Sequence, residues 1–384
     1  MVFVGHGADR TGPPVFLANF QRWLSAHADL EFGTILTRGG PLVEQYRSWG
    51  PVRILDRRWT VPRVAQAGLA RMGHPGPAST IESVRDRGHL RSWRRAPVVY
   101  LNTASPATLR ALPFIARSSR VIAHIHELEL ALRYQLNETE RDLLLDRPER
   151  FIAASNAVAA NLIERYGVST DRVEVHHEFV APVTPAAPGE RRQALEELGL
   201  SPDTFVVGAS GMTEWRKGPD IFLRVADELR RMIDRPLAFL WVGGATAGPE
   251  WWPLDHEARH LEVDDIVRFL GERTDPDAWF RLFHVFALTS REDAFPLAVL
   301  EAATAQVPLV TFDTGGMVEF AALSGGAVIP YPDVKAFATE LAVLATDEGC
   351  RRRRGAEAAR EALLHHVPAA GAPRLLRLIE GLDP

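Results

Sequence analysis

The sequence predicts an α/β protein built from two doubly wound, parallel-sheet domains. Short apolar runs alternate with longer helical patterns along the chain, this alternation occurs twice, and a proline-rich segment separates the two series. Parallel strands connected by helices are covered on both faces, so each is expected to read as a continuous apolar run. The length of 384 residues suits two domains of about 150–200 residues each. We expect one domain over residues 1–182 and a second over residues 183–370.

Six strands are expected in the first domain, each a short apolar run bounded by turn or polar residues. They cover residues 1–5, 32–37, 98–102, 121–126, 150–155 and 173–180. A helical pattern over residues 158–167 (VAANLIERYG) separates the last two. This order, strand then helix then strand, favours a parallel sheet.

Six more strands are expected in the second domain, over residues 205–211, 237–244, 266–271, 284–290, 307–313 and 326–331. Residues 220–233 (DIFLRVADELRRMI) form a helical pattern between the first two. The segment APVTPAAPGE, residues 181–190, contains three prolines and a glycine and is typical of a linker. Two such domains should face each other across a cleft and bind ligand at the carboxyl ends of their strands.

The composition of the chain indicates the compartment in which the protein folds. A single cysteine, Cys350, excludes an internal disulfide and a zinc site built from cysteines. The first residues, MVFVGHGADR, lack the basic and apolar regions of a secretory signal, and no apolar run reaches the roughly 18 residues that span a bilayer. We therefore expect a cytoplasmic protein.

Charge is divided unevenly along the chain. Residues 1–180 carry a formal charge of +5 and the remainder −10. The basic excess is concentrated in the ten arginines from Arg53 to Arg95, and the stretch RDRGHLRSWRRAP, residues 85–97, has Trp93 among its arginines. This composition suits an anionic membrane, at its inner face, or a phosphate-bearing acceptor, and a solvated helix face is the alternative. The net charge of −5 and the lack of a recognition motif argue against nucleic acid as a partner.

A carboxylate stands inside an apolar run in the segment SREDAFPLAVLEAATAQVPLVTF, residues 290–312. Pro296 suits the first position of a helix, whose free amides at Leu297 and Ala298 would attract an anion. Glu301 would then lie two turns further on, at the base of the same cleft, where a carboxylate can accept hydrogen bonds from the two hydroxyls of a ribose. The alternative is a glutamate on an exposed helix flank, the usual place for this residue.

The same segment resembles the acid-x7-acid signature of retaining glycosyltransferases with the GT-B fold, family 4 (glycosyl transferases group 1). Asp293 and Glu301 fill the two acidic positions, and the family's usual first glutamate is here replaced by Asp293, with Glu292 before it. Further pieces follow in the family's order: RTGPP, IHE, AASNAVAANLIERYGV, WRKGPD, VRFLGE, HVFALTSRED and VTFDTGGMVE. Their ordered set covers nearly the whole chain. The resemblance implies that the terminal helix, residues 371–384, crosses back to the first domain.

The resemblance also implies roles for residues of the second domain. Glu301 would bind the ribose, Asp293 the hydroxyls of the donor sugar, and Lys217 the diphosphate. Backbone amides near Phe295 and Leu297 would assist. The family's second cation is an arginine at the position of Met212, for which Arg216 or Arg273 would have to substitute.

In the first domain, the resemblance implies that Gly12 lets its loop approach the donor closely and that His126 contacts the sugar near the reacting carbon. His126 is expected to be catalytic, together with Asp293 and Lys217. A structural, hydrogen-bonding histidine is the alternative.

The reaction implied is a retaining transfer, of hexosyltransferase type, from a nucleotide diphosphate sugar to the hydroxyl of a glycan, lipid-linked or natural-product acceptor. We expect a front-face reaction without metal or cofactor, and UDP is the nucleotide that the family favours. The motif DPD, residues 275–277, is interpreted as a turn rather than a metal site.

Two alternatives remain for the function. A catalytically inactive GT-B scaffold would explain Met212 and Asp293. A nucleotide-dependent oxidoreductase would require G-x-G-x-x-G, and Gly5, Gly7 and Gly12 do not have that spacing.

Overall fold

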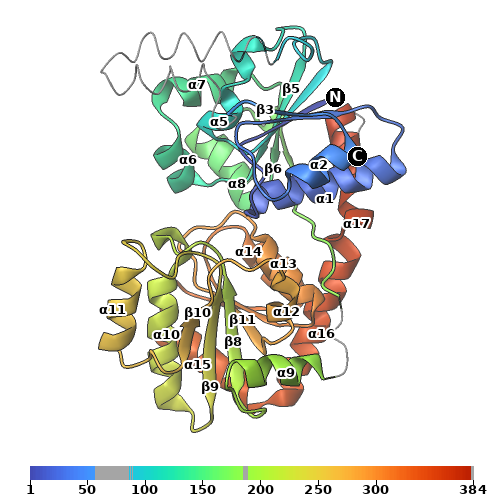
Figure 1. Cartoon of the computed structure of the whole chain (residues 1–384). Coiled ribbons are helices and arrows are strands. Elements are labelled where there is room, and N and C mark those ends of the chain that lie inside the picture. Colours follow the sequence, from blue (N-terminus) through green and yellow to red (C-terminus); the bar gives the residue numbers. More distant parts are fainter. Residues whose placement is uncertain (57–85, 87, 89, 185–188, 382–384) are drawn as a thin grey trace. The chain divides into compact units, whose positions relative to one another are not determined.

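The computed structural model describes residues 1–56, 86, 88, 90–184 and 189–381 (Figure 1). The chain divides into two compact units. Unit 1 comprises Met1–His177 and Gly371–Pro384, and unit 2 comprises Glu178–Ala370. Residues 185–188 of the expected linker lie outside the described residues.

Unit 1 contains a seven-stranded parallel sheet in the order β3-β2-β1-β4-β5-β6-β7. The strands are β1 Val2–Gly5, β2 Gly33–Leu36, β3 Val52–Ile54, β4 Val98–Asn102, β5 Arg120–Ile125, β6 Arg150–Ala153 and β7 Val173–Val175. All six predicted strands are present. β3 was not predicted, because it is an edge strand of three residues that is only partly buried and therefore has no continuous apolar run. The predicted strand over residues 173–180 was too long, since β7 ends at Val175 and His176 and His177 follow it.

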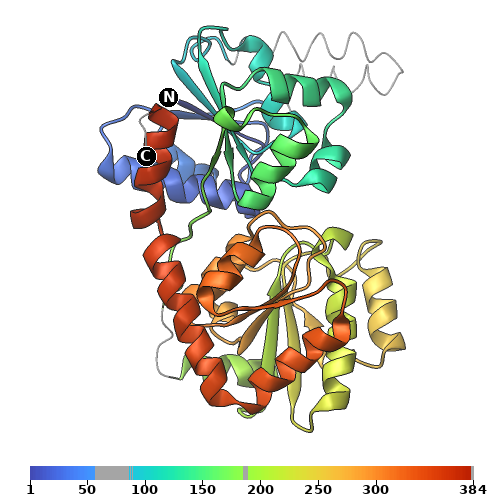
Figure 2. The same cartoon turned by 180° about the vertical axis from the view of Figure 1, so that it is seen from behind.

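Helices cover both faces of this sheet (Figures 1 and 2). They are α1 Gly12–His27, α2 Val43–Trp49, α5 Pro106–Leu109, α6 Glu129–Gln135, α7 Glu138–Asp146, α8 Asn156–Ala160 and the terminal α17 Pro368–Glu380. The predicted helix over residues 158–167 is realised as the end of α8 followed by a π-helical turn, Asn161–Arg165. Ser155 caps the start of α8, and its hydroxyl accepts a hydrogen bond from the amide of Val158 at 3.2 Å.

Unit 2 contains a six-stranded parallel sheet in the order β10-β9-β8-β11-β12-β13. The strands are β8 Phe205–Ser210, β9 Leu237–Val242, β10 Val267–Phe269, β11 Val285–Leu288, β12 Leu309–Phe312 and β13 Ala327–Ile329, one for each predicted strand. The helices are α9 Glu190–Glu197, α10 Pro219–Met232, α11 Trp252–His260, α12 Pro276–Phe280, α13 Leu297–Thr304, α14 Met317–Ser324, α15 Val334–Thr346 and α16 Glu348–His365. Two parallel-sheet domains are thus confirmed.

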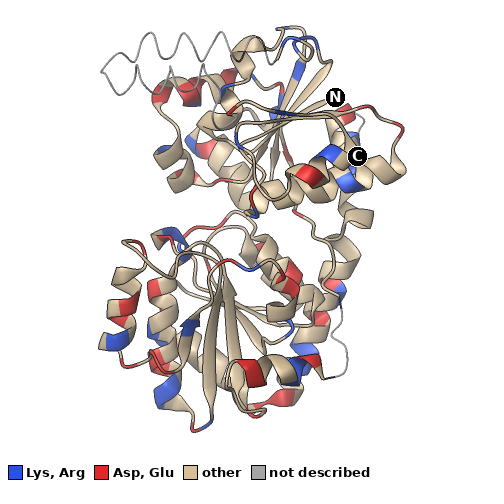
Figure 3. Ribbon diagram, in the orientation of Figure 1, with Lys and Arg blue, Asp and Glu red and all other residues tan. Residues whose placement is uncertain are grey.

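The helix α10 illustrates how each sheet is covered. Its apolar residues recur every three or four positions, so one face of the helix is buried. From that face the ring of Phe222 contacts Phe239 and Trp241 on β9 edge-to-face, with ring centroids 5.2 and 5.4 Å apart. Truncation of Phe222 to alanine should cost about 3–5 kcal/mol of stability, because the ring is fully buried. Charged residues concentrate on helices and loops, whereas the strands are mostly uncharged (Figure 3).

Both sheets have a topological switch point, the place where successive strands begin to be added on the opposite side. It lies between β1 and β4 in unit 1 and between β8 and β11 in unit 2. Loops that leave the carboxyl ends of these strands diverge and create a crevice suited to ligands. None of the helices described in this structure is long and apolar enough to cross a bilayer.

Candidate functional site

Three loops meet at the carboxyl ends of the central strands of unit 2. They follow β8 (residues 211–218), β11 (residues 289–296) and β12 (residues 313–316). The first two flank the switch point, because β8 and β11 are neighbours in the sheet. Most of the residues expected to bind the donor lie on these loops or on the helix that follows the second one.

Lys217 and Asp293 form a close ion pair between two of these loops. The Nζ atom of Lys217 lies 2.5 Å from Oδ2 of Asp293, and the Oγ atom of Ser290 donates to the same oxygen at 3.1 Å. A guanidinium nitrogen of Arg216 lies 3.7 Å from Oδ1 of Asp293 and donates to the carbonyl of Glu292 at 3.0 Å. The structure therefore brings four predicted residues, Arg216, Lys217, Glu292 and Asp293, into one cluster.

Glycines allow this cluster to form. A Cβ atom on Gly315, which has a φ of +66°, would lie 1.9 Å from the carbonyl oxygen of Asp293. The amide of Gly316 donates to that oxygen at 3.0 Å. Gly218, with a φ of +70°, approaches the carbonyl of Thr289 equally closely. Larger residues at Gly218 or Gly315 would push the loops apart.

The charge of Asp293 is set by its neighbours. Burial alone would raise the pKa of its carboxyl, but the positive charges of Lys217 and Arg216 outweigh burial and lower that pKa. Asp293 is therefore ionised at neutral pH. One of the two cations beside Asp293 is a lysine, although only two of the chain's 44 lysine and arginine residues are lysines, Lys217 and Lys335. A lysine at 217 thus departs from the chain's strong preference for arginine.

Glu301 lies in the second turn of α13, on the partly buried side of the helix. Burial, together with the negative charge of Asp277, raises the pKa of its carboxyl to about 7. Within the described part of the chain, no hydrogen bond or ion pair reaches this carboxylate. The arrangement is costly for the ligand-free protein, so the fold alone gives no reason for a glutamate at this position.

The start of α13 differs from the prediction by one residue. Pro296 was expected to be the first helical residue, but its ψ of 123° is extended and the helix begins at Leu297. The first free amides still belong to Leu297 and Ala298. Phe295 does not point to an open site; its ring is 5% exposed and stacks on His366 with centroids 5.5 Å apart.

The resemblance leaves Arg216 or Arg273 to replace the arginine that is missing at Met212. Arg216 lies beside Asp293, as described above, whereas Arg273 is exposed and stacks on the ring of Trp279 at 4.8 Å. In this structure only Arg216, of these two, contacts the cluster.

His126 and Gly12 follow the central strands of unit 1. His126 comes directly after β5, with Nε2 3.3 Å from Oδ1 of Asn102 at the end of β4. Its ring contacts Phe16 of α1 edge-to-face, with centroids 5.6 Å apart. Gly12 begins α1, and a Cβ atom there would meet no protein atom within 4 Å. Among the described residues of unit 1, nothing therefore requires a glycine at this position.

Glu127 is a site residue to which the sequence pattern gave no role. Its buried carboxylate accepts hydrogen bonds from the amides of His126 and Ala104, both at 3.0 Å, and from the hydroxyl of Thr103. Thr103 has a φ of +102°, a strained conformation for a β-branched residue. Glu127 therefore joins the ends of β4 and β5 and fixes the backbone at His126. The acid directly after a strand-end histidine was the only signal for it in the sequence.

His124, two residues before His126, is fully buried and its Nδ1 lies 2.5 Å from the hydroxyl of Tyr100. Burial, reinforced by His126 and His176, lowers the pKa of His124 well below its usual value. His124 is therefore neutral at neutral pH. Of the basic stretch from Arg53 to Arg95, residues 57–85, 87 and 89 lie outside the described residues, so its proposed contact with a membrane or acceptor stays a prediction. The absence of a metal also stays a prediction.

Comparison with known proteins identifies relatives along most of the chain. Residues 190–362 match the family model described as Glycosyl transferases group 1, and residues 34–184 match Glycosyltransferase Family 4. A D-inositol 3-phosphate glycosyltransferase of Kribbella flavida is 30% identical over 231 residues, which are 57% of this chain and 53% of that protein. Another, of Thermobifida fusca, is 30% identical over 266 residues, 66% of this chain and 60% of that protein. The aligned region thus spans between about half and three-fifths of these relatives' length.

Among solved structures, Anabaena HepE in complex with UDP and glucose matches with a TM-score of 0.79 at 17% identity, over 99% of both chains. WaaG, a glycosyltransferase involved in lipopolysaccharide biosynthesis, matches with a TM-score of 0.74 at 15% identity, again over 99% of both chains. At these identities the match concerns the fold.

Proposed function

The chain belongs to the GT-B glycosyltransferases, and we propose that it transfers a sugar from a nucleotide diphosphate sugar to an acceptor hydroxyl, with retention of configuration and without a metal ion. The observation that carries this proposal is the cluster of Lys217, Arg216 and Asp293 at the switch point of unit 2. On the helix that follows, α13, no hydrogen bond or ion pair from the described residues reaches the carboxylate of Glu301.

Unit 2 would bind the donor through its diphosphate and ribose. Lys217 and Arg216 supply positive charge, and the amides of Leu297 and Ala298 add the positive end of α13. The carboxylate of Glu301 would accept hydrogen bonds from both ribose hydroxyls, which would compensate its burial. Complexes of HepE with UDP and with UDP-glucose support UDP as the nucleotide.

The ion pair between Lys217 and Asp293 has a consequence for binding. In the ligand-free protein each charge neutralises the other at 2.5 Å. A donor diphosphate would share Lys217 with Asp293, while Asp293 would accept hydrogen bonds from sugar hydroxyls. Asp293 would then orient the sugar and keep Lys217 directed at the leaving group.

In the reaction, the bond between the anomeric carbon and the diphosphate oxygen breaks, and the acceptor oxygen bonds to that carbon from the same face. The acceptor proton passes to an oxygen of the leaving diphosphate. Lys217, Arg216 and the helix amides would stabilise the negative charge that develops there. No protein nucleophile is needed in this scheme.

Unit 1 would supply His126, whose imidazole would contact the sugar near the reacting carbon. Asn102 orients the ring and Glu127 fixes the backbone at this position. We assign Glu127 the role of a positioning residue, since it would act through His126 rather than on the sugar.

The test is to incubate the protein with UDP-glucose and follow UDP release, with and without a panel of acceptor alcohols, and to determine the anomeric configuration of the product by NMR. Release of UDP that is lost in Lys217→Ala supports the proposal, and an inverted product would refute retention. The alternative of an inactive scaffold predicts binding of UDP-glucose without release of UDP under any of these conditions.

A further inference from the structure

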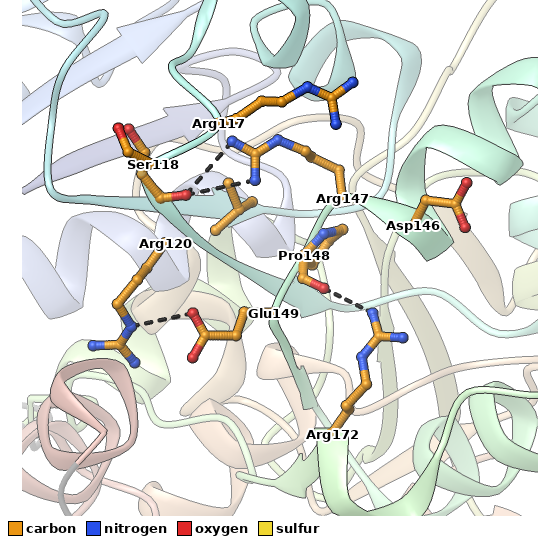
Figure 4. Close-up of a pocket in the computed structure, with 10 residues that line it drawn as sticks. Arg117, Ser118, Arg120, Asp146, Arg147, Pro148, Glu149 and Arg172 are labelled. Carbon is orange, nitrogen blue, oxygen red and sulfur yellow. Dashed lines mark hydrogen bonds and ion pairs between the residues drawn. The ribbon is translucent and has the colours of Figure 1, made fainter.

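A basic pocket lies at the amino ends of β5 and β6 in unit 1, opposite the carboxyl ends that carry His126 and Glu127 (Figure 4). Its volume is about 430 Å³, and four arginines from three segments line it: Arg117, Arg120, Arg147 and Arg172. β5 has six residues, so this end lies about 20 Å from His126, which follows the opposite end of the strand. The pocket is therefore separate from the groups proposed to take part in transfer.

Only one of the four arginines has a carboxylate partner among the described residues. Arg120 pairs with Glu149 at 3.3 Å. The side chain of Arg147 donates instead to the carbonyl of Ala116 at 2.8 Å, and that of Arg172 to the carbonyl of Pro148 at 2.7 Å. Carbonyl groups hold a guanidinium in place without neutralising its charge. The lining also includes Asp146, so four positive charges face two negative ones.

Arg117 and Arg147 are near neighbours in this pocket (Figure 4). Burial, followed by the charge of Arg117, lowers the pKa of Arg147. Two guanidiniums placed together repel each other unless an anion lies between them. Arg117 is exposed and makes no hydrogen bond to the described residues, so its five N–H groups are available to a ligand.

We propose that this pocket binds a phosphate group, held between Arg117 and Arg147 with the charge of Arg172 in support. Both terminal nitrogens of Arg147 donate to the carbonyls of Ala116 and Ser119, so the fork of Arg117 and the remaining N–H groups of Arg147 would donate to the phosphate oxygens. The charge of a phosphate monoester, about −2, balances the excess of positive charge in the lining. The side chain of Ser118, at the rim, offers a further donor. The phosphate belongs either to a soluble phosphoester or to a lipid headgroup.

Hydrogen–deuterium exchange with inorganic phosphate tests the site directly, at constant ionic strength maintained with sodium chloride. Phosphate should slow exchange in peptides that cover residues 116–121 and 145–149. This local readout separates the pocket from phosphate bound near Lys217, which would protect residues 211–218 instead. Arg117→Gln should weaken the first effect about tenfold, whereas Arg133→Gln, an exposed arginine on α6, should leave it unchanged.

Cosedimentation with vesicles identifies the source of the phosphate. Phosphatidylcholine vesicles with about one-fifth phosphatidic acid should retain the protein, and Arg117→Gln should release it, if a lipid headgroup is the ligand. Retention independent of Arg117, together with phosphate protection that requires it, assigns the site to a soluble phosphoester. Absence of local protection by phosphate, or equal protection in Arg117→Gln, would overturn the proposal. UDP release from UDP-glucose should be unchanged in Arg117→Gln, so this test does not depend on the proposed transfer.

Discussion

Replacing Glu301 by glutamine should stabilise the ligand-free protein and weaken nucleotide binding. In the folded protein burial raises the pKa of Glu301 from 4.5 to about 7, which corresponds to about 3 kcal/mol of preference for the protonated form. The stability of the wild type relative to a protein with a permanently neutral side chain at 301 is therefore unaffected below about pH 4.5, and it is lost as pH rises through about 7. Glutamine is neutral at every pH and keeps the side chain's shape.

The advantage of the Glu301→Gln protein should therefore grow with pH. Between about pH 5 and about pH 8, the difference in unfolding free energy between variant and wild type should rise by about 2–3 kcal/mol. For a unit of this size that is about 5–10 °C in Tm. Urea and thermal denaturation at both pH values measure it, with Glu250→Gln, at an exposed position, as the matched control.

Binding should change in the opposite direction. Loss of a carboxylate that accepts two hydroxyl hydrogen bonds should weaken UDP-glucose binding about 10–100-fold at about pH 8. UDP-glucose is preferred to UDP here, because a terminal phosphate titrates near pH 6 itself. A variant that is less stable than wild type at about pH 8, yet binds UDP-glucose normally, would refute both the buried charge and the ribose contact.

Three further predictions concern the rest of the site. UDP-glucose should slow reductive methylation of Lys217, followed by mass spectrometry, but not that of the exposed Lys335; equal rates with and without the donor would argue against a diphosphate contact. Glu127→Gln should lower kcat about tenfold with little change in donor affinity, and the loss should not add to that of His126→Ala; additive losses would contradict a positioning role. Chelation by EDTA should leave UDP release unchanged, and recovery of a lost activity by a divalent ion would refute the metal-free mechanism.

The strands of both sheets could be predicted because strands covered on two faces must be apolar along their whole length. β3 and the end of β7 could not, since a short edge strand buries too little to impose a pattern. The start of α13 was missed by one residue because Pro296 suits both a first helical position and the extended residue before it.

The candidate site divides in the same way. The sequence predicted the types of residue in the site. A lysine and the start of a helix are groups that bind an anion, and a carboxylate within an apolar run is costly unless it binds a ligand. The pairing of Lys217 with Asp293, 76 residues apart, depends on β8 and β11 being neighbours at the switch point. The bonds of Glu127 depend likewise on the adjacency of β4 and β5.

What the sequence determined by itself is the class of fold and the chemical character of its loops, since both follow from local pattern and residue type. The tertiary structure alone decided which of those groups meet. It paired Arg216 rather than Arg273 with Asp293, and it left the carboxylate of Glu301 partly buried without a partner in the described chain. It also gathered Arg117 and Arg147 around one pocket. Strand order is set by packing between distant segments, and no local pattern encodes it.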